Sequence, residues 1–245
     1  MCGVERVDEE RKLARTQCWD AYRLGMASTA GRARGRYART AGRRREIAQA
    51  VLDLVEEKGH AGVTTAEVAR RAGTSEATVL YHYPSRDHLL VAALERDEEL
   101  TVLQAERDGV RPAAGLAGLD LDVLGEHAQA AARRESLLRL RVALAGLAAT
   151  PGHPAADYFA RHRRVAIETY AGLVAERQRR GQAHPSLDPV EVARQVMATW
   201  EGLNAQWLLA PDFDLGATLV SAFRRLSGQN WMEAARAVLE PPTGI

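Results

Sequence analysis

Apolar residues recur at helical spacing along most of the chain, and no stretch shows the apolar and polar alternation that is typical of a half-buried strand. The clearest case lies between residues 40 and 58, where one helical face would carry Ile47, Val51, Leu54 and Val55. Gly59 follows at a position where glycine often ends a helix in the left-handed conformation. The pattern predicts an amphipathic helix over residues 40–58 and an all-α fold for the chain.

A short helix is predicted directly after this first one. Thr64 and Glu67 have the spacing of a capping box, in which each side chain bonds the backbone N–H of the other. Gly73 then ends the helix after about two turns and provides the turn to the next element.

A second short helix is predicted from Glu76 to Tyr83. Ser75 can cap its start, and Pro84 prevents its continuation. Ser85 then caps a longer helix that extends to about residue 107. The residues of the second short helix that can face inward are Val79, Leu80 and Tyr83.

The rest of the chain is also predicted to be helical, in segments separated by glycine and proline. Residues 109–118 contain Pro112 and three glycines, which marks a break between domains. The predicted helices beyond it cover residues 121–133, 135–148, 155–180, 189–209, 215–226 and 231–239.

These elements divide the chain into three parts. We expect a disordered basic arm over residues 1–39, a helix-turn-helix domain over residues 40–94 and a second helical domain over residues 119–240. Met26 opens a segment that leads into the basic run, so the sequence leaves open whether residues 1–25 belong to the functional protein.

Charge clusters in one place, although the chain as a whole is balanced. Lys and Arg number 33 and Asp and Glu 32, yet seven arginines and no acid lie between Arg32 and Arg45. Such a run is usually a solvated tail, but beside a helix-turn-helix it favours contact with nucleic acid. No apolar run approaches the ~18 residues of a membrane helix, so we expect a soluble cytoplasmic protein without a membrane partner.

The sequence offers no candidate for catalysis. It has no nucleophile elbow, phosphate-binding loop or zinc-protease motif, and its seven histidines are scattered. Cys2 and Cys18 lie far from any cluster with metal-ligand spacing. We therefore expect no enzyme, no cofactor and no metal.

Two short helices joined by a glycine-containing turn, behind a longer helix, are the parts of a helix-turn-helix DNA reader. The segment Gly62–Leu90, which reads GVTTAEVARRAGTSEATVLYHYPSRDHLL, resembles the N-terminal domain of TetR/AcrR-type transcriptional regulators, and the likeness covers about fifty residues in all. In one departure, Leu80 stands where the family usually has a tyrosine that contacts phosphate, and the aromatic residue is Tyr81. The resemblance implies a homodimer, usually a repressor, that binds a palindromic double-stranded operator and releases it when a small-molecule effector enters the C-terminal domain.

The resemblance also implies which residues would contact DNA. Thr65 and Arg86 correspond to phosphate anchors, which position the protein without reading sequence. On the second short helix, Glu76 can accept a hydrogen bond from cytosine, and the methyl groups of Ala77 and Thr78 can contact thymine. The expected DNA-binding residues are Arg34, Arg36, Arg43, Arg44, Thr65, Ser75, Glu76, Ala77, Thr78, Tyr81, His82 and Arg86.

Taken singly, these residues have ordinary explanations. Ser75 is a good helix cap in any protein, Glu76 suits any helix N-terminus, and His82 could be a solvated residue at a helix end. Their order within one helix-turn-helix favours the DNA-binding interpretation.

The second helical domain gives weaker indications. Polar His162 and Asn204 lie among apolar residues, where burial would require a partner. A core residue satisfied by backbone or water is the simpler explanation, and an effector pocket is the alternative. The candidate pocket residues are His162, Trp200, Asn204 and Trp207, and the candidate dimer-interface residues are Val196, Leu203, Leu219 and Phe223.

The function predicted from the sequence is therefore DNA-binding transcriptional regulation, with double-stranded operator DNA, a second copy of the chain and an unidentified small-molecule effector as partners. The alternative is a constitutive or architectural DNA-binding dimer that has no ligand. The sequence does not separate the two.

Overall fold

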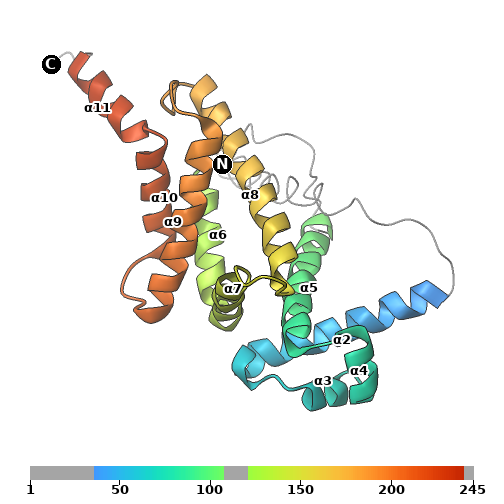
Figure 1. Cartoon of the computed structure of the whole chain (residues 1–245). Coiled ribbons are helices and arrows are strands. Elements are labelled where there is room, and N and C mark those ends of the chain that lie inside the picture. The colour runs from blue at the N-terminus through green and yellow to red at the C-terminus, as the bar shows by residue number, and fades with distance from the viewer. Residues whose placement is uncertain (1–35, 108–120, 240–245) are drawn as a thin grey trace, which may run out of the picture. The chain divides into compact units, whose positions relative to one another are not determined.

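The computed structural model describes residues 36–107 and 121–239 (Figure 1). Regular structure in these two ranges is helical throughout, which confirms the all-α prediction. Residues 1–35 of the predicted arm and the predicted break at residues 109–118 lie outside the described residues.

The helices fall close to the predicted ranges. The largest difference is at the first helix, which begins at Arg36, so the last four residues of the predicted arm are helical. The helices are α2 (Arg36–Lys58), α3 (Thr65–Arg71), α4 (Glu76–His82), α5 (Arg86–Arg107), α6 (Leu121–Arg133), α7 (Glu135–Leu147), α8 (Ala155–Arg179), α9 (Pro189–Leu209), α10 (Leu215–Leu226) and α11 (Gln229–Leu239), with a short 3-10 turn, η1, at His60–Gly62.

The described residues form two compact units. Residues 36–107 and 131–161 make up the first, called here the N-terminal unit, and residues 121–130 and 162–239 make up the second, the C-terminal unit. The division into domains at residues 94 and 119 stays a prediction. Residues 131–161 nevertheless group with the short helices, because α7 packs against both α2 and α5.

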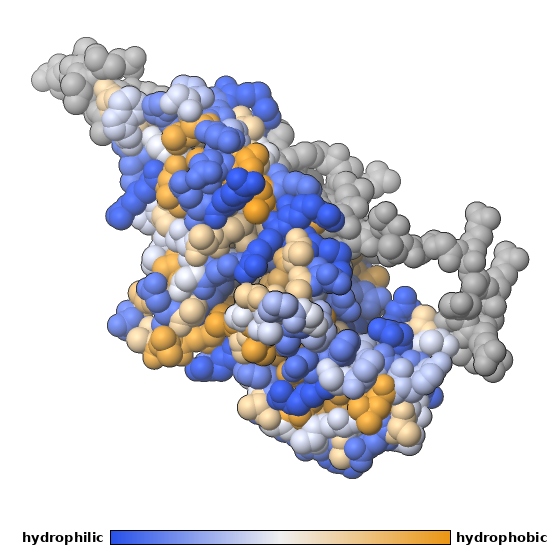
Figure 2. Space-filling view, viewed as in Figure 1, coloured by the Kyte–Doolittle hydropathy of each residue, from blue (hydrophilic) through white to orange (hydrophobic). Residues whose placement is uncertain are grey.

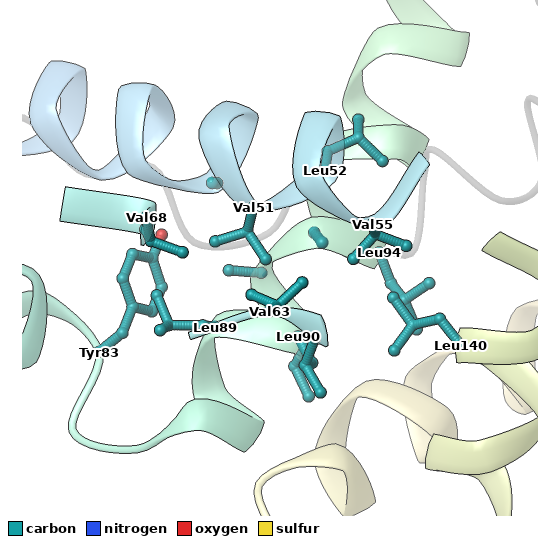
Figure 3. Close-up of a cluster of buried hydrophobic side chains, with 14 of the residues drawn as sticks. Val51, Leu52, Val55, Val63, Val68, Tyr83, Leu89, Leu90, Leu94 and Leu140 are labelled. Carbon is teal, nitrogen blue, oxygen red and sulfur yellow. The ribbon is translucent and has the colours of Figure 1, made fainter. Parts of the chain in front are cut away.

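One hydrophobic core holds the N-terminal unit together (Figure 3). The inward face of α2 packs against α5, and the predicted apolar residues Ile47, Val51 and Val55 are fully buried there. Leu140 from α7 reaches the same core beside Leu94 of α5. Burying each such side chain stabilises the fold by about 1.5–3 kcal/mol, so this core fixes where the short helices can lie.

Buried carboxylates continue this packing along the second half of α5. Asp97 is buried, and Arg134 Nη1 lies 2.5 Å from its Oδ1. Glu98 is also buried, and it accepts a hydrogen bond from the Tyr158 hydroxyl of α8 while Arg141 of α7 lies 3.7 Å away. Burial raises the pKa of Asp97 and of Tyr158 above the ordinary values. A buried carboxylate requires such partners, so these contacts hold α5 in one rotation against α7 and α8.

Arg86, at the start of α5, ties the loop before α3 to the rest of the unit. Its Nε donates to the Val63 carbonyl at 3.1 Å, and its Nη2 donates to the His60 carbonyl. The two acceptors lie 23 and 26 residues away in the sequence. We call this pair of bonds the Arg86 strap.

In the C-terminal unit, α6 and α10 approach so closely that only glycine fits at their contact. A Cβ atom on Gly216 of α10 would lie 2.5 Å from the Gly125 carbonyl oxygen of α6, and backbone cannot yield as a flexible side chain can. Beside this contact, Leu215, Leu219 and Phe223 of α10 are fully buried. The close approach therefore sets the distance between two helices of this core.

We expect Gly216→Ala to destabilise the chain by about 1–3 kcal/mol, because an added methyl group has no space at this contact. Gly146→Ala is the control: nothing lies within 4 Å of a Cβ there, so the change should stabilise α7 by about 0.5–1 kcal/mol. The midpoints of urea unfolding curves measure the stability change of both variants. A Gly216→Ala chain as stable as the wild type would contradict the close approach.

We expect Arg86→Ala to lower the free energy of unfolding by about 1–3 kcal/mol, because two backbone carbonyls each lose a hydrogen bond. Arg70→Ala, at an exposed arginine of α3, should change stability by less than about 0.5 kcal/mol. Thermal unfolding of the two variants makes the comparison. Equal stability of both would show that the strap contributes nothing.

Candidate nucleic-acid interface

Local capping bonds build the two short helices. The Thr64 hydroxyl accepts from the Glu67 backbone N–H at 3.4 Å and donates to the Glu67 carboxylate at 2.7 Å, which confirms the predicted capping box. Gly73 adopts the left-handed conformation, with a φ of 60°, and turns the chain toward α4. The Ser75 hydroxyl then accepts from the Thr78 N–H at 3.2 Å, so α4 begins at the next residue, Glu76.

The seven-residue helix α4 packs through one narrow edge. Val79 is fully buried and Tyr83, its C-terminal cap, is 6% exposed. Glu76 and Ala77 are exposed, and Tyr81 is 81% exposed. The helix thus presents most of its surface to solvent, which is the arrangement that a groove-reading helix requires.

Arg44 of α2 fixes the C-terminal end of α4. Its Nη1 donates to the His82 carbonyl at 3.1 Å, and its guanidinium lies 4.6 Å from the centre of the Tyr83 ring. In return the Tyr83 hydroxyl donates to the Arg44 carbonyl at 3.1 Å. A cation at a helix C-terminus also complements the helix dipole. We call this set of contacts the Arg44–Tyr83 lock.

Burial at this end of α4 shifts the pKa values of His82 and Tyr83. Partial burial, with Arg44 and Arg43 nearby, lowers the pKa of His82 below its usual value, so the imidazole is mainly neutral at pH 7. Burial raises the pKa of Tyr83, which keeps its hydroxyl protonated as the donor of the lock. In the DNA-free chain His82 is therefore a neutral hydrogen-bonding group and not a cation.

The predicted arginine contacts are less available than their number suggests. Arg43 lies 2.7 Å from Glu46 and donates weakly to the Ala72 carbonyl at 3.5 Å, and Arg44 is held in the lock. Arg86, predicted to anchor a phosphate, uses two of its three nitrogens in the strap. Arg36 is the first residue of α2, and Arg34 lies outside the described residues.

The remaining predicted residues lie on or beside the short helices. Thr65 is the first residue of α3 and is half-buried. The hydroxyls of Ser75 and Thr78 lie 2.9 Å apart and bond each other, so each already has a partner within α4.

One prediction about α4 is wrong. Leu80 was expected to face inward, but it is 44% exposed. The reason is that α4 is buried through one narrow edge, at Val79 and Tyr83, and Leu80 points about 100° away from Val79 around the helix. Sequence reasoning missed this residue because a seven-residue helix is too short for periodicity to separate its faces, although the departure from the family pattern at this position was a signal.

The candidate pocket residues all lie in the C-terminal unit. Asn204 of α9 is 3% exposed, and its Oδ1 has no hydrogen-bond partner within the ranges that the structure describes. Trp200, Trp207 and His162 are half-buried. A buried carbonyl oxygen without a donor is costly, which makes Asn204 the member of this set that most needs a partner.

The candidate interface residues require a correction. Val196, Leu219 and Phe223 are at most 1% exposed within a single chain, so they form the core of their own unit, and only Leu203 among the four is half-buried. The surface that α9 and α10 do present is a groove of about 500 Å³, lined by Thr199, Ala217, Thr218, Ser221, Ala222, Arg225 and Leu226. A dimer formed through these helices would use this groove.

The described residues contain neither a metal-binding cluster nor a membrane-spanning helix. No group of three or more His, Cys, Asp or Glu side chains there could hold a metal ion. Within the same ranges, no helix is long and apolar enough to cross a membrane.

Residues 47–93 match the model of the family described as bacterial regulatory proteins, tetR family. Over 162 residues the chain is 23% identical to the A-factor receptor protein of Streptomyces griseus, a match that covers 65% of this chain and 53% of the receptor. It is 31% identical over 93 residues to the transcriptional regulator RutR of Escherichia coli strain K12, covering 36% of this chain and 44% of RutR. The chain thus spans about half the length of these relatives, whose names describe regulators or receptors and no enzyme.

Solved structures extend the likeness to most of the chain. A TetR-family regulator from Rhodococcus sp. is 25% identical with a TM-score of 0.57, over 76% of this chain and 99% of that one. A regulator from Saccharomonospora viridis in complex with choline has a TM-score of 0.58 over 78% and 97% of the two chains, and at 23% identity it shows the fold alone. The chain therefore carries a TetR-family DNA-binding domain, with its family match at residues 47–93, within the fold of a TetR-type transcriptional regulator.

Proposed function

We propose that the chain binds double-stranded operator DNA as a homodimer, with α4 of each copy in the major groove, and represses transcription until a small-molecule effector releases it. The exposed face of α4 carries the proposal. The Ser75 cap, the buried Val79 and the Arg44–Tyr83 lock hold α4 on the core of its unit. The match of residues 47–93 to the TetR family supports the same role.

Recognition of a palindrome requires two copies. In a symmetric dimer the two α4 helices would enter successive major grooves about 34–36 Å apart, so the operator would contain two inverted half-sites. The groove between α9 and α10 suits the contact between copies, because its small side chains allow helices to approach closely. A protein that binds chromosomal DNA in this way would work in the cytoplasm.

Release by an effector would use the C-terminal unit. The buried Oδ1 of Asn204 could accept a hydrogen bond from an effector that carries an N–H or O–H group, with Trp200 and Trp207 as apolar neighbours on the same helix. An effector that binds better to the DNA-free arrangement would weaken operator binding, and operator would weaken effector binding by the same factor. Two solved structures with this fold are complexes with choline and with imidazole, which supports a small-molecule site in this fold.

Selection of bound fragments from the genome of the source organism, followed by sequencing, should yield a common inverted repeat. On that DNA we expect Tyr81→Ala to weaken binding about tenfold or more, because it removes the most exposed large side chain of α4. Trp231→Ala, an exposed aromatic residue of the C-terminal unit, should bind as the wild type does. Fluorescence anisotropy at fixed salt measures all three proteins.

Binding that shows no sequence preference would contradict the proposal of an operator. Selective binding that no small molecule from the source organism shifts would instead favour the alternative, a constitutive DNA-binding dimer.

We expect Ser221→Arg to dissociate the dimer, because the substitution places a charge in the middle of the α9–α10 groove on both copies of a symmetric interface. Ala160→Arg, at an exposed position of α8, should leave the dimer intact. Sedimentation velocity at several protein concentrations measures the change. An unaltered dimer in the Ser221→Arg chain would remove this groove from the interface.

A further inference from the structure

Leu80 lies in the middle of the face that α4 offers to DNA. At about 100° per residue, Glu76, Leu80, Ala77 and Tyr81 follow one another around an arc of about 140°. Leu80 is 44% exposed, whereas Val79 beside it is fully buried. In Figure 2 the surface over α3 and α4 is correspondingly mixed, with apolar residues among hydrophilic ones.

The chemistry of this side chain limits what it can recognise. Leucine has no donor or acceptor, so it can bond neither a phosphate nor the polar edge of a base. The apolar group that a base pair presents in the major groove is the C5-methyl of thymine. Covering both apolar groups removes them from water, which favours the contact without any hydrogen bond.

We infer that Leu80 is a specificity-determining residue that packs on a thymine methyl group in each half-site. The inference rests on the proposed function, since it needs α4 to lie in the major groove. The flanking residues are consistent with it: Ala77 is too short to cover a methyl group alone, and Tyr81 lies with its ring 5.1 Å from the His82 ring. The half-site should therefore contain a thymine that no polar side chain contacts.

Deoxyuridine tests this contact, because it differs from thymidine only by the missing C5-methyl and pairs with adenine in the same way. The full chain is measured on its selected operator, with each thymine replaced in turn at matched positions of both half-sites. For the wild-type protein, replacement of thymine by uracil at one position should lower the affinity about fourfold per half-site. This is the factor expected for burying one methyl-sized group.

Three variants assign the effect to a side chain. Leu80→Ala should bind the thymine and uracil operators equally, whereas Leu80→Met, which keeps an apolar side chain of similar length, should still prefer thymine. Leu147→Ala is the matched control: Leu147 of α7 is 46% exposed in the same unit, and its loss should leave the preference unchanged. Because the thymine-to-uracil ratio is taken within each protein, a small loss of stability in a variant cancels.

The outcomes separate this inference from the proposed function. A preference for thymine that disappears in Leu80→Ala supports it. Selective binding in which no uracil substitution matters, or in which Leu80→Ala keeps the preference, would overturn it and leave the regulator intact. Absence of any selective DNA binding would overturn both.

Discussion

The placement of α4 depends on its one narrow buried edge, which joins the core that α2, α3 and α5 share. A helix of seven residues is not stable in water by itself, because nucleation costs more than so few hydrogen bonds return. Burial of Val79 and Tyr83 provides the missing stabilisation, and Arg44 adds a cation at the helix C-terminus. Since only this edge is used, the remaining surface of α4 stays available. Leu80 is half-exposed for the same reason, because it lies outside the buried edge.

The two units are stabilised by different means. In the N-terminal unit, an apolar core is extended by carboxylates of α5 that arginine and tyrosine side chains contact, and such contacts select one rotation of the helix. In the C-terminal unit, α6 and α10 meet backbone to backbone at Gly125 and Gly216, so their spacing tolerates little change. Polar partners therefore set orientation in one unit, and steric contact sets distance in the other.

Much of the fold could be predicted from the sequence, because caps and breakers are local signals. Thr64, Ser75, Gly73 and Pro84 act within a few residues, and the helix bounds agree closely as a result. The partners of Arg86 could not be predicted, since its carbonyl acceptors lie more than twenty residues away. The order of residues in the helix-turn-helix likewise predicted the family, whereas the roles of single side chains there stay predictions.

In the C-terminal unit, the spacing of apolar residues predicts that α10 has an apolar face. Spacing does not show whether that face packs in the core of its own chain or against a second copy. Leu219 and Phe223 were therefore predicted to lie at an interface, although both are buried within a single chain.

Three neighbouring arginines of α2 already have partners within the chain, and this affects how many counterions DNA binding would release. Each phosphate that a cation neutralises releases condensed counterions, and this release makes affinity fall as salt rises. Arg43, Arg44 and Arg45 already contact Glu46, the His82 carbonyl and Glu99. A charge that must first leave an intramolecular partner gains less from a phosphate. The net counterion release on binding should thus be smaller than the arginine count of this segment implies, which shifts the balance of affinity toward the shape and apolar chemistry of the groove.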